Sequence, residues 1–278
     1  MSKLVGVKIC MLSQPNLGYR YMISENASTF DSLKTLDDIP STNRTLQELK
    51  NYSDSSDLAQ QTKNYRDNFK KSRKDGLAAL KNFILNRNGN IKSHYTYFGR
   101  TKSKVLKNEL NTSLKRKQRK NFIDSNFQNE LPSGHFIYFP LGVDEERNIL
   151  ISAPLHTNQI ETIRNIVRSM PIKYELVVKE NPNQEIRDWR KISEYQEILR
   201  IPNVTLLNPS FSTEEIYNKC SLIITTGGSA GFEAAFYGKH SIILSDLGYG
   251  ILPSVHRLKS VESLSLTIKK ALEEKFDI

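Results

Sequence analysis

The sequence has no long apolar run and only two cysteines among its 278 residues. Its apolar stretches, such as 222–224, fall far short of the ~18 residues that a membrane-spanning helix needs. The stretch 4–12 is broken by Lys8 and precedes no small-residue cleavage pattern, so we expect no signal peptide. Cys10 and Cys220 lie far apart in the sequence, and we interpret them as free thiols of a cytoplasmic protein.

Several familiar motifs are also missing. The sequence contains neither a Walker phosphate loop nor a GxGxxG fingerprint, which argues against ATP and NAD as ligands. It shows no Ser/His/Asp order of a hydrolase and no metal-ligand spacing. We therefore expect no metal and no cofactor.

The positive charge is concentrated in the first half of the chain. Residues 1–135 contain 24 Lys and Arg against 12 Asp and Glu, a net charge of +12, whereas residues 136–278 contain 16 against 18, a net charge of −2. The densest run extends from Lys115 to Lys120. Such a run can bind anionic lipid, a polyanionic glycan or nucleic acid, or it can be a solvated helix face. No nucleic-acid-binding signature accompanies it, so we expect no nucleic-acid partner.

From residue 136 onward, short apolar segments alternate with amphipathic ones. The expected strands are 136–139, 175–178, 204–207, 222–225 and 241–244, and the expected helices are 157–170, 186–199, 213–219, 230–237 and 263–274. Strands that are apolar throughout and separated by helices are typical of a parallel sheet covered on both faces. The pattern predicts an α/β fold with a parallel Rossmann-like sheet.

The first part of the chain does not repeat this pattern. A possible strand at 5–12 precedes helix-prone segments at 45–73 and 75–85 and a basic stretch at 92–127. We interpret the region as part of another domain followed by a helical, basic linker. Pro and Gly within 130–134 mark the expected boundary, which gives domains at 1–134 and 135–278.

The most distinctive local feature is the glycine-rich loop that follows the expected strand 222–225. Glycines let a backbone approach a ligand closely, and Thr226 and Ser229 add hydroxyl groups suited to a phosphate. Glu233 can accept hydrogen bonds from a ribose or sugar hydroxyl. The alternative is a tight turn whose glycines only permit packing, with Glu233 stabilising a helix start.

Two further strand ends carry polar groups. After the strand 175–178, Lys179 can place a charge on a phosphate, Asn181 can donate hydrogen bonds, and Glu180 can act as a base if burial raises its pKa. An ordinary strand exit is the competing interpretation. After the first strand, Glu146 is a candidate for base or nucleophile, whereas we interpret Asp144 and its neighbour Glu145 as a hydrated loop.

An ordered series of segments carries a family resemblance over about 120 residues. The series comprises Phe139-Pro140-Leu141, Asn158-Gln159, Val178-Lys179-Glu180-Asn181-Pro182, Pro202-Asn203-Val204 and Thr226-Gly227-Gly228-Ser229-Ala230-Gly231-Phe232-Glu233-Ala234. In order and spacing it resembles the capsule polysaccharide biosynthesis family, which includes bacterial capsule Kdo transferases. The resemblance implies a GT-B glycosyltransferase, in which two Rossmann-like domains face a cleft and the C-terminal one holds a nucleotide sugar.

The resemblance also implies which residues form the site. It implies a donor site built from Lys179, Asn181, Gly228, Ser229, Gly231 and Glu233. From the glycine-rich loop itself we add Thr226 and Ala230 to the expected donor-binding residues, and the catalytic candidates are Glu146 and Glu180. The chain departs from the family at Asn181 and at Gly142, where relatives usually have histidine. The first departure removes a positive charge from the expected phosphate site.

The leading hypothesis is a metal-independent glycosyltransferase of capsule or surface-polysaccharide assembly, with a nucleotide sugar as donor and a glycan or lipid-linked acceptor. One alternative is a sugar-nucleotide epimerase of the same fold. Another is a non-catalytic or partner-dependent half that binds a chain supplying the acceptor domain. The basic cluster further suggests peripheral binding to the inner face of the membrane.

Overall fold

The computed structural model of the protein describes residues 6, 10–13, 22–25, 43–54, 73–85, 101–143, 147–185 and 190–275. The chain divides into two compact units, one formed by Met1–Gln61 with Phe127–Ile278 and the other by Thr62–Asn126. The boundary expected near residue 134 stays a prediction. In the part of the chain that is described, no helix combines the length and the apolar character that crossing a bilayer requires.

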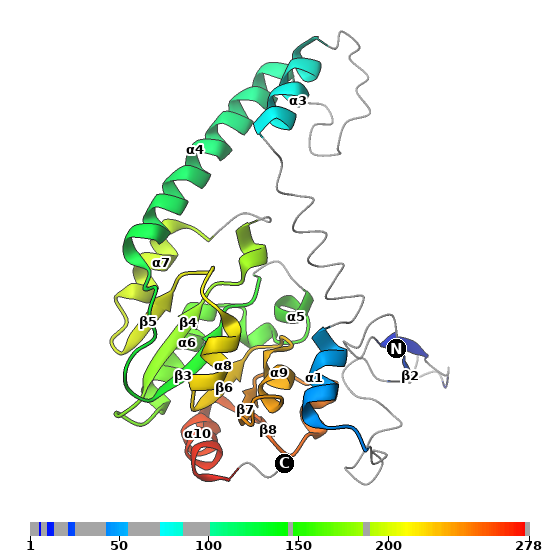
Figure 1. Ribbon diagram of the computed structural model, residues 1–278, viewed down its shortest axis with the longest axis vertical. Helices are drawn as coiled ribbons and strands as arrows, with labels where there is room; N and C mark the ends of the chain where they lie inside the picture. Colours follow the sequence, from blue (N-terminus) through cyan, green and yellow to red (C-terminus); the bar gives the residue numbers. More distant parts are fainter. Residues whose placement is uncertain are drawn as a thin grey trace. The chain divides into compact units, whose positions relative to one another are not determined.

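The larger unit is built on a six-stranded parallel sheet (Figure 1). Its strands are β3 (Phe136–Pro140), β4 (Glu175–Lys179), β5 (Val204–Leu207), β6 (Leu222–Thr225), β7 (Ser241–Ile243) and β8 (Val255–Arg257). The five expected strands are confirmed, as is the α/β fold class. The short edge strand β8 was not expected, because its Val-His-Arg sequence carries no apolar run.

Helices flank this sheet, and all but the last of them lie between successive strands along the chain. They are α5 (Arg147–Leu150), α6 (Gln159–Ser169), α7 (Ile192–Leu199), α8 (Thr213–Lys219), α9 (Ala230–Ala235) and α10 (Leu264–Glu273). Ser212 caps α8 by accepting a hydrogen bond from the Glu215 amide at 3.3 Å, while the Glu215 carboxylate contacts Lys219. Gly238 follows α9 with a φ of 63°, a left-handed conformation that glycine adopts without strain.

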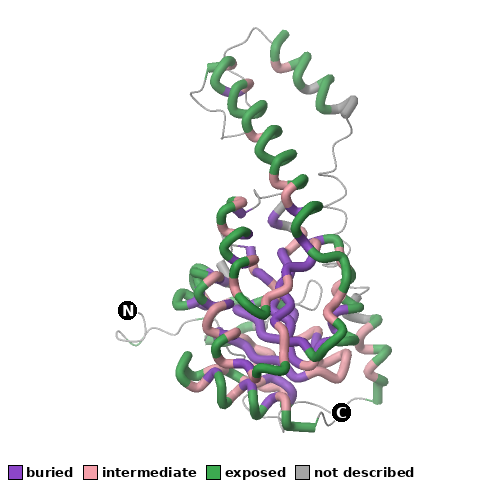
Figure 2. Tube along the Cα trace, turned by 90° about the vertical axis from the view of Figure 1, so that its left-hand side faces the viewer, coloured by how far each residue is buried: buried purple, intermediate pink, exposed green. Residues whose placement is uncertain are grey.

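The core lies between the sheet and these helices. Phe136 and Tyr138 on β3 pack in one buried cluster with Ile216 and Tyr217 of α8 and with Ala234 of α9. On the sheet's other side, α6 packs against α7 and α10. Figure 2 shows that the strands are mostly buried. Both faces of the sheet are therefore covered, which explains why its strands are apolar throughout.

An N-terminal helix also belongs to this unit. Helix α1 (Leu46–Asp54) lies beside α9 in Figure 1. Its Lys50 ammonium pairs with Glu214 at 3.1 Å and lies 4.2 Å from the centre of the Tyr237 ring. The unit also contains the antiparallel strands β1 (Met11–Ser13) and β2 (Met22–Ser24). Of the strand expected at 5–12, positions 5 and 7–9 lie outside the described residues.

The second unit contains α3 (Arg73–Leu85) and the 25-residue helix α4 (Lys102–Asn126). The Lys102 ammonium donates a hydrogen bond to the Ile84 carbonyl at 3.3 Å. Helix α4 is exposed along most of its length (Figure 2). The described residues of this unit are helical and rich in basic side chains, as expected.

The order of the strands determines where a ligand can bind. The sheet runs β5-β4-β3-β6-β7-β8, so the chain builds outward from β3 in one direction and then returns to build outward from β6 in the other. This is the doubly wound order of dinucleotide-binding domains. At the switch point between β3 and β6 the following loops diverge, which leaves a crevice outside the carboxyl ends of the strands.

Candidate functional site

A pocket of about 190 Å³ occupies this crevice. The loops that follow β3, β4 and β6 supply most of its lining, and Thr213 and Tyr217 of α8 complete it. Of the site residues predicted from the sequence, the pocket is lined by Lys179, Glu180, Asn181, Thr226, Gly228, Ser229, Ala230 and Glu233. The structure thus brings all three predicted strand-end loops to the pocket, the loop after β3 through Leu141 and Gly142. Glu146 lies outside the described residues.

A larger depression of about 700 Å³ lies on the surface between α6 and α7. Its lining comes from α6, α7 and the turn before β5, not from the loops at the carboxyl ends of the strands, and Arg164 on its wall pairs with Glu161 and Glu197. Exposed ion pairs of this kind are ordinary features of a protein surface. The smaller pocket at the switch point is therefore the better candidate site.

Lys179 is held by α8 at the edge of the pocket. Its ammonium group donates hydrogen bonds to the Phe211 carbonyl at 2.7 Å and to the Thr213 hydroxyl at 2.6 Å. The residue is 4% exposed, and burial lowers the pKa of Lys179 to about 8. The ammonium has one further N–H, which leaves it able to donate to an anion in the pocket.

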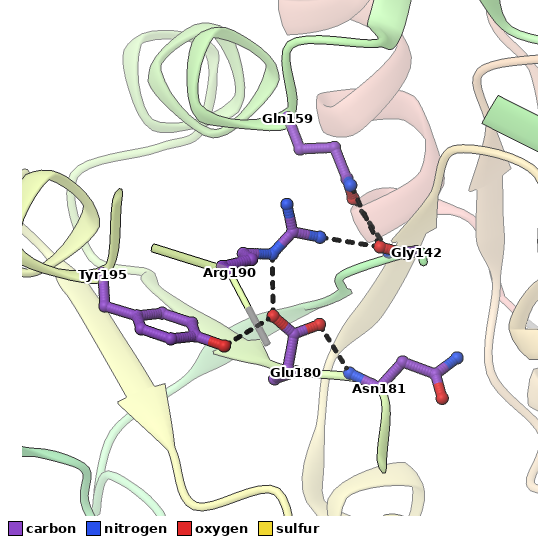
Figure 3. A network of polar contacts seen from close by, with 6 residues as sticks. All are labelled: Gly142, Gln159, Glu180, Asn181, Arg190 and Tyr195. Carbon is purple, nitrogen blue, oxygen red and sulfur yellow. Dashed lines mark hydrogen bonds and ion pairs between the residues drawn. The ribbon is translucent and has the colours of Figure 1, made fainter. Parts of the chain in front are cut away.

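Glu180 is the centre of a buried polar network (Figure 3). Its carboxylate accepts hydrogen bonds from Arg190 Nε at 2.7 Å, the Tyr195 hydroxyl at 3.0 Å and the Asn181 amide at 2.9 Å. Burial raises the pKa of Glu180 to about 7, and the Arg190 charge opposes that rise. Glu180 is fully buried, so its contacts shape the loop after β4.

The same network fixes the loop after β3. Arg190 Nη2 donates to the Gly142 carbonyl at 2.7 Å. The Gln159 side chain donates to that carbonyl at 3.0 Å and accepts from the Gly142 amide at 2.8 Å (Figure 3). A Cβ at position 142 would lie 2.6 Å from the Ile149 side chain. A histidine at this position, as in the family that the sequence resembles, would therefore require a rearrangement of Ile149.

Glu233, on α9, also lines the pocket. Its carboxylate accepts hydrogen bonds from the Tyr217 hydroxyl at 2.9 Å and the Ser229 hydroxyl at 2.5 Å. Burial and the neighbouring Glu233 carboxylate raise the pKa of Tyr217, which keeps the phenol protonated as a donor. A carboxylate has about four acceptor positions, so Glu233 can still accept from a hydroxyl of a ligand.

Thr226 carries a buried hydroxyl group for which the structure shows no hydrogen-bond partner. The residue is 2% exposed and lines the pocket, while its carbonyl accepts a hydrogen bond from Ser245 at 2.7 Å. An unpaired buried hydroxyl costs about 1–3 kcal/mol. A polar ligand in the pocket would remove this cost by supplying the missing partner.

Gly231 does not line the pocket but supports it. A Cβ at this position would lie 3.0 Å from the Tyr249 hydroxyl and 3.2 Å from Ile243. Because glycine has no Cβ, the Tyr249 side chain can pack against Gly231, and its hydroxyl donates a hydrogen bond to the Gly228 carbonyl at 2.5 Å. The structure thus gives Gly231 a packing contact, which is the interpretation that competed with ligand binding for the glycines of this loop.

Sequence reasoning did not identify Arg190, Tyr195, Tyr217 or Tyr249 as parts of the site. Tyr195 and Tyr217 belong to helices, Tyr249 to a 3-10 helix, and Arg190 to the segment just before α7. Their local sequence patterns show only packing or surface character, so the site contacts of these residues depend on tertiary packing. Gln159 belongs to the ordered series of motifs, which was the one available signal for it.

No protein-family profile and no curated protein matches this chain. Among solved structures, the chain is similar to the β-Kdo 2,7-transferase KpsC of Thermosulfurimonas dismutans, with 16% identity and a TM-score of 0.36 over 55% of this chain and 50% of that protein. It is similar to the UDP-GlcNAc 2-epimerase of Methanocaldococcus jannaschii, whose structure was solved with UDP-GlcNAc and UDP. The identity is 15% and the TM-score 0.38 over 57% of this chain and 42% of that protein. It is also similar to the spinosyn rhamnosyltransferase SpnG, with 13% identity and a TM-score of 0.35 over 52% of this chain and 39% of that protein.

The matched part of this chain spans half or less of the length of each of these three proteins. At such low identity and TM-score, the similarity adds no argument about what the chain does. The strand order of the sheet and the pocket at its switch point therefore carry the interpretation of this domain as Rossmann-like.

Proposed function

We propose that this chain contains the nucleotide-sugar-binding domain of a glycosyltransferase that assembles a capsule or another surface polysaccharide. The observation that carries the proposal is the pocket at the switch point, where the loop after β4 and the glycine-rich loop after β6 meet. The motif series that resembles capsule transferases supplies both of these loops. The proposal thus joins a sequence resemblance to a pocket that contains most of the implied residues.

In this proposal the phosphates of the donor lie against the glycine-rich loop. The Thr226 hydroxyl supplies a hydrogen bond and Lys179 supplies the positive charge. When the sugar is transferred, negative charge builds up on the departing phosphate, and fixed donors that stabilise it lower the barrier. Asn181 contributes a neutral donor where relatives have histidine, so Lys179 is the main source of charge.

The two carboxylates that line the pocket have different roles in this proposal. Glu233 binds a hydroxyl of the nucleoside or sugar. Glu180, which is enclosed by Arg190, Tyr195 and the Asn181 amide, positions the loop after β4 instead of touching the acceptor. The base that activates the acceptor is then Glu146 or a residue of another domain.

A partner-dependent form of this activity is the second candidate. It is favoured by one observation: both carboxylates that the described residues place at the pocket already accept hydrogen bonds from protein groups. In this form a second Rossmann-like domain, on this or another chain, supplies the acceptor site and the base. Adding that domain is then required for transfer of sugar to a glycan or lipid-linked acceptor, but not for binding of the donor.

Calorimetric titration with UDP, CMP, GDP and their sugar conjugates tests the proposal. We expect one nucleotide series to bind at pH 7 and its affinity to fall as the pH rises through about 8, because Lys179 then loses its proton. The variant Lys179→Met should bind at least about tenfold more weakly, which corresponds to roughly 1.4 kcal/mol, and should lose this pH dependence.

The matched control is Lys173→Met, which removes an exposed lysine outside the pocket and should bind like the unmodified protein. Thermal melts of each variant confirm that the fold is retained at the titration temperature. If every nucleotide fails to bind, or if Lys179→Met binds as tightly as the control, the proposed donor site is wrong.

A further inference from the structure

A cluster of two histidines and a glutamate lies away from the pocket, where β7, β8 and α10 come together. His240 immediately precedes β7, His256 is the central residue of β8, and Glu274 follows the last residue of α10. His240 is at the amino end of its strand, whereas the pocket lies at the carboxyl ends. The cluster is therefore separate from the proposed donor site.

The ligand atoms of this cluster face one another. His256 Nε2 lies 3.2 Å from His240 Nδ1 and 3.4 Å from Glu274 Oε2, and the three atoms all lie within 4.8 Å of one another. A tetrahedral zinc ion with ligand bonds of about 2.0–2.1 Å separates its ligand atoms by roughly 3.3 Å. The two measured separations match the edges of such a tetrahedron.

The chemistry of the three groups also suits a transition-metal ion. Imidazole nitrogen and carboxylate oxygen are common zinc ligands, and a two-histidine, one-carboxylate set leaves a fourth position for water. The histidines are largely buried, whereas Glu274 is partly exposed, with its side chain 40% accessible. Glu274 can therefore adjust its position around an ion that the two histidines hold.

We propose that His240, His256 and Glu274 form a binding site for a divalent transition-metal ion, with zinc as the ion that fits best. Residues 240, 256 and 274 are widely spaced, so no sequence motif marks the site. A bound ion ties the end of α10 to the edge strand β8 and to the start of β7. The site thus stabilises the last part of the sheet unit and is independent of nucleotide binding.

One neighbouring charge competes with the ion. Lys270 pairs with the second carboxylate oxygen of Glu274 at 3.3 Å, which draws that carboxylate towards α10. Removing this lysine should free Glu274 for the ion. We therefore expect Lys270→Met to strengthen zinc binding. If the three residues only formed hydrogen bonds with one another, this substitution would not increase zinc affinity.

Calorimetric titration of the tag-free protein with zinc chloride tests the site. We expect one ion per chain, and we expect His256→Gln and Glu274→Gln each to weaken binding at least about tenfold, since even outer-shell partners of a metal commonly contribute that much. Zinc should raise the melting temperature of the unmodified protein, because an ion that binds only the folded state stabilises it, and this rise should disappear in both variants.

Cobalt(II) gives a second readout, because a tetrahedral site shows an intense visible absorption that an octahedral aquo ion lacks. The matched control His135→Gln removes an exposed histidine from the same edge of the sheet and should leave both signals unchanged. Equal zinc affinity in His256→Gln and the control, several weak ions per chain, or no binding at all would each overturn the proposal. Glu274→Gln alters a position that is much more exposed than either histidine, so the test does not depend on replacing a buried side chain.

Discussion

At the scale of single residues, the structure separates the residues that contact the pocket from those that shape it. Lys179, Thr226 and Glu233 line the pocket with polar groups that can meet a ligand. Glu180 and Gly231, which were predicted in the same way, contribute a buried network and a packing contact. Adjacent positions in the chain, such as Lys179 and Glu180, thus have side chains with different partners.

Replacing Thr226 by valine tests the unpaired hydroxyl directly. Valine has nearly the same shape, so the change removes a buried polar group that has no partner and should leave the free energy of unfolding unchanged or slightly higher. It should nevertheless weaken nucleotide binding about fivefold to tenfold, the effect of one lost hydrogen bond of ~1–1.5 kcal/mol. Urea unfolding and calorimetry measure the two quantities.

Thr225→Val is the matched control for this prediction. The Thr225 hydroxyl already accepts a hydrogen bond from the Gly228 amide at 3.3 Å, so its loss should lower stability. If Thr226→Val is clearly destabilising in the absence of ligand, the hydroxyl has a partner in the protein and the argument for a ligand at this position fails.

Replacing Arg190 by glutamine tests the buried pair with Glu180. Removing one partner of a buried ion pair costs about 3–5 kcal/mol of stability. Burial already raises the pKa of Glu180 to about 7 in the folded protein, and loss of Arg190 should raise that pKa further. A carboxyl group whose folded-state pKa is raised loses its stabilising contribution as the pH rises through that pKa.

The destabilisation by Arg190→Gln should therefore be larger at pH 8, where Glu180 would be buried and charged, than at pH 5, where it takes up a proton. Chemical unfolding at the two pH values measures this difference. Arg164→Gln is the control, because it breaks exposed pairs with Glu161 and Glu197 and should cost no more than about 1 kcal/mol at either pH. An equal loss for Arg190→Gln at both pH values would contradict the proposed charge state.

At the scale of elements, helix α4 concentrates the basic character of the N-terminal region. It contains eight Lys and Arg against two Asp and Glu, and five of the six side chains from Lys115 to Lys120 are exposed. An enzyme that uses a lipid-linked acceptor works next to an anionic membrane surface. The helix therefore gives a physical basis for predicting that the protein binds such a surface.

Sedimentation with vesicles of phosphatidylserine and phosphatidylcholine tests this prediction. Each Lys or Arg near an anionic surface contributes about 1 kcal/mol, so changing Lys115, Arg116 and Lys117 to glutamine should weaken binding roughly a hundredfold. Changing Lys173, Lys191 and Lys219, which are exposed on the sheet unit, to glutamine alters the net charge equally and should have little effect. Similar losses in both triple variants, or binding that persists at high salt, would show that α4 is not the binding element.

Elements were predictable to different degrees for identifiable reasons. The strands β3 to β7 each contain a run of apolar residues, so composition alone locates them. The helix α8 was predicted at its exact bounds, because Ser212 marks its start. Strand β8 was missed because a short edge strand needs few apolar side chains, and its pairing with β7 depends on backbone hydrogen bonds that any sequence can make.

At the scale of the whole molecule, strand order rather than strand identity creates the pocket. The same succession of strands and helices along the chain is compatible with several strand orders in the sheet. Only an order that places β4, β3 and β6 side by side brings their loops to one crevice. The packing of α1 against α8 and α9 is a second feature of this kind. It joins residues near position 50 to the sheet unit, although the local sequence resembles the linker region.

The fold class, the positions of most strands and helices, and the loops in which polar groups gather could be predicted from the sequence, because each of these depends on the spacing of apolar, glycine and capping residues along a short stretch of chain. The three-dimensional structure was needed to show that Glu180 is enclosed by Arg190 and Tyr195, that Thr226 lines the pocket and has a buried hydroxyl with no hydrogen-bond partner, and that two distant histidines meet Glu274. Whether a polar side chain has a hydrogen-bond partner depends on its burial and on residues from remote elements. The local spacing of residues in the sequence predicts neither.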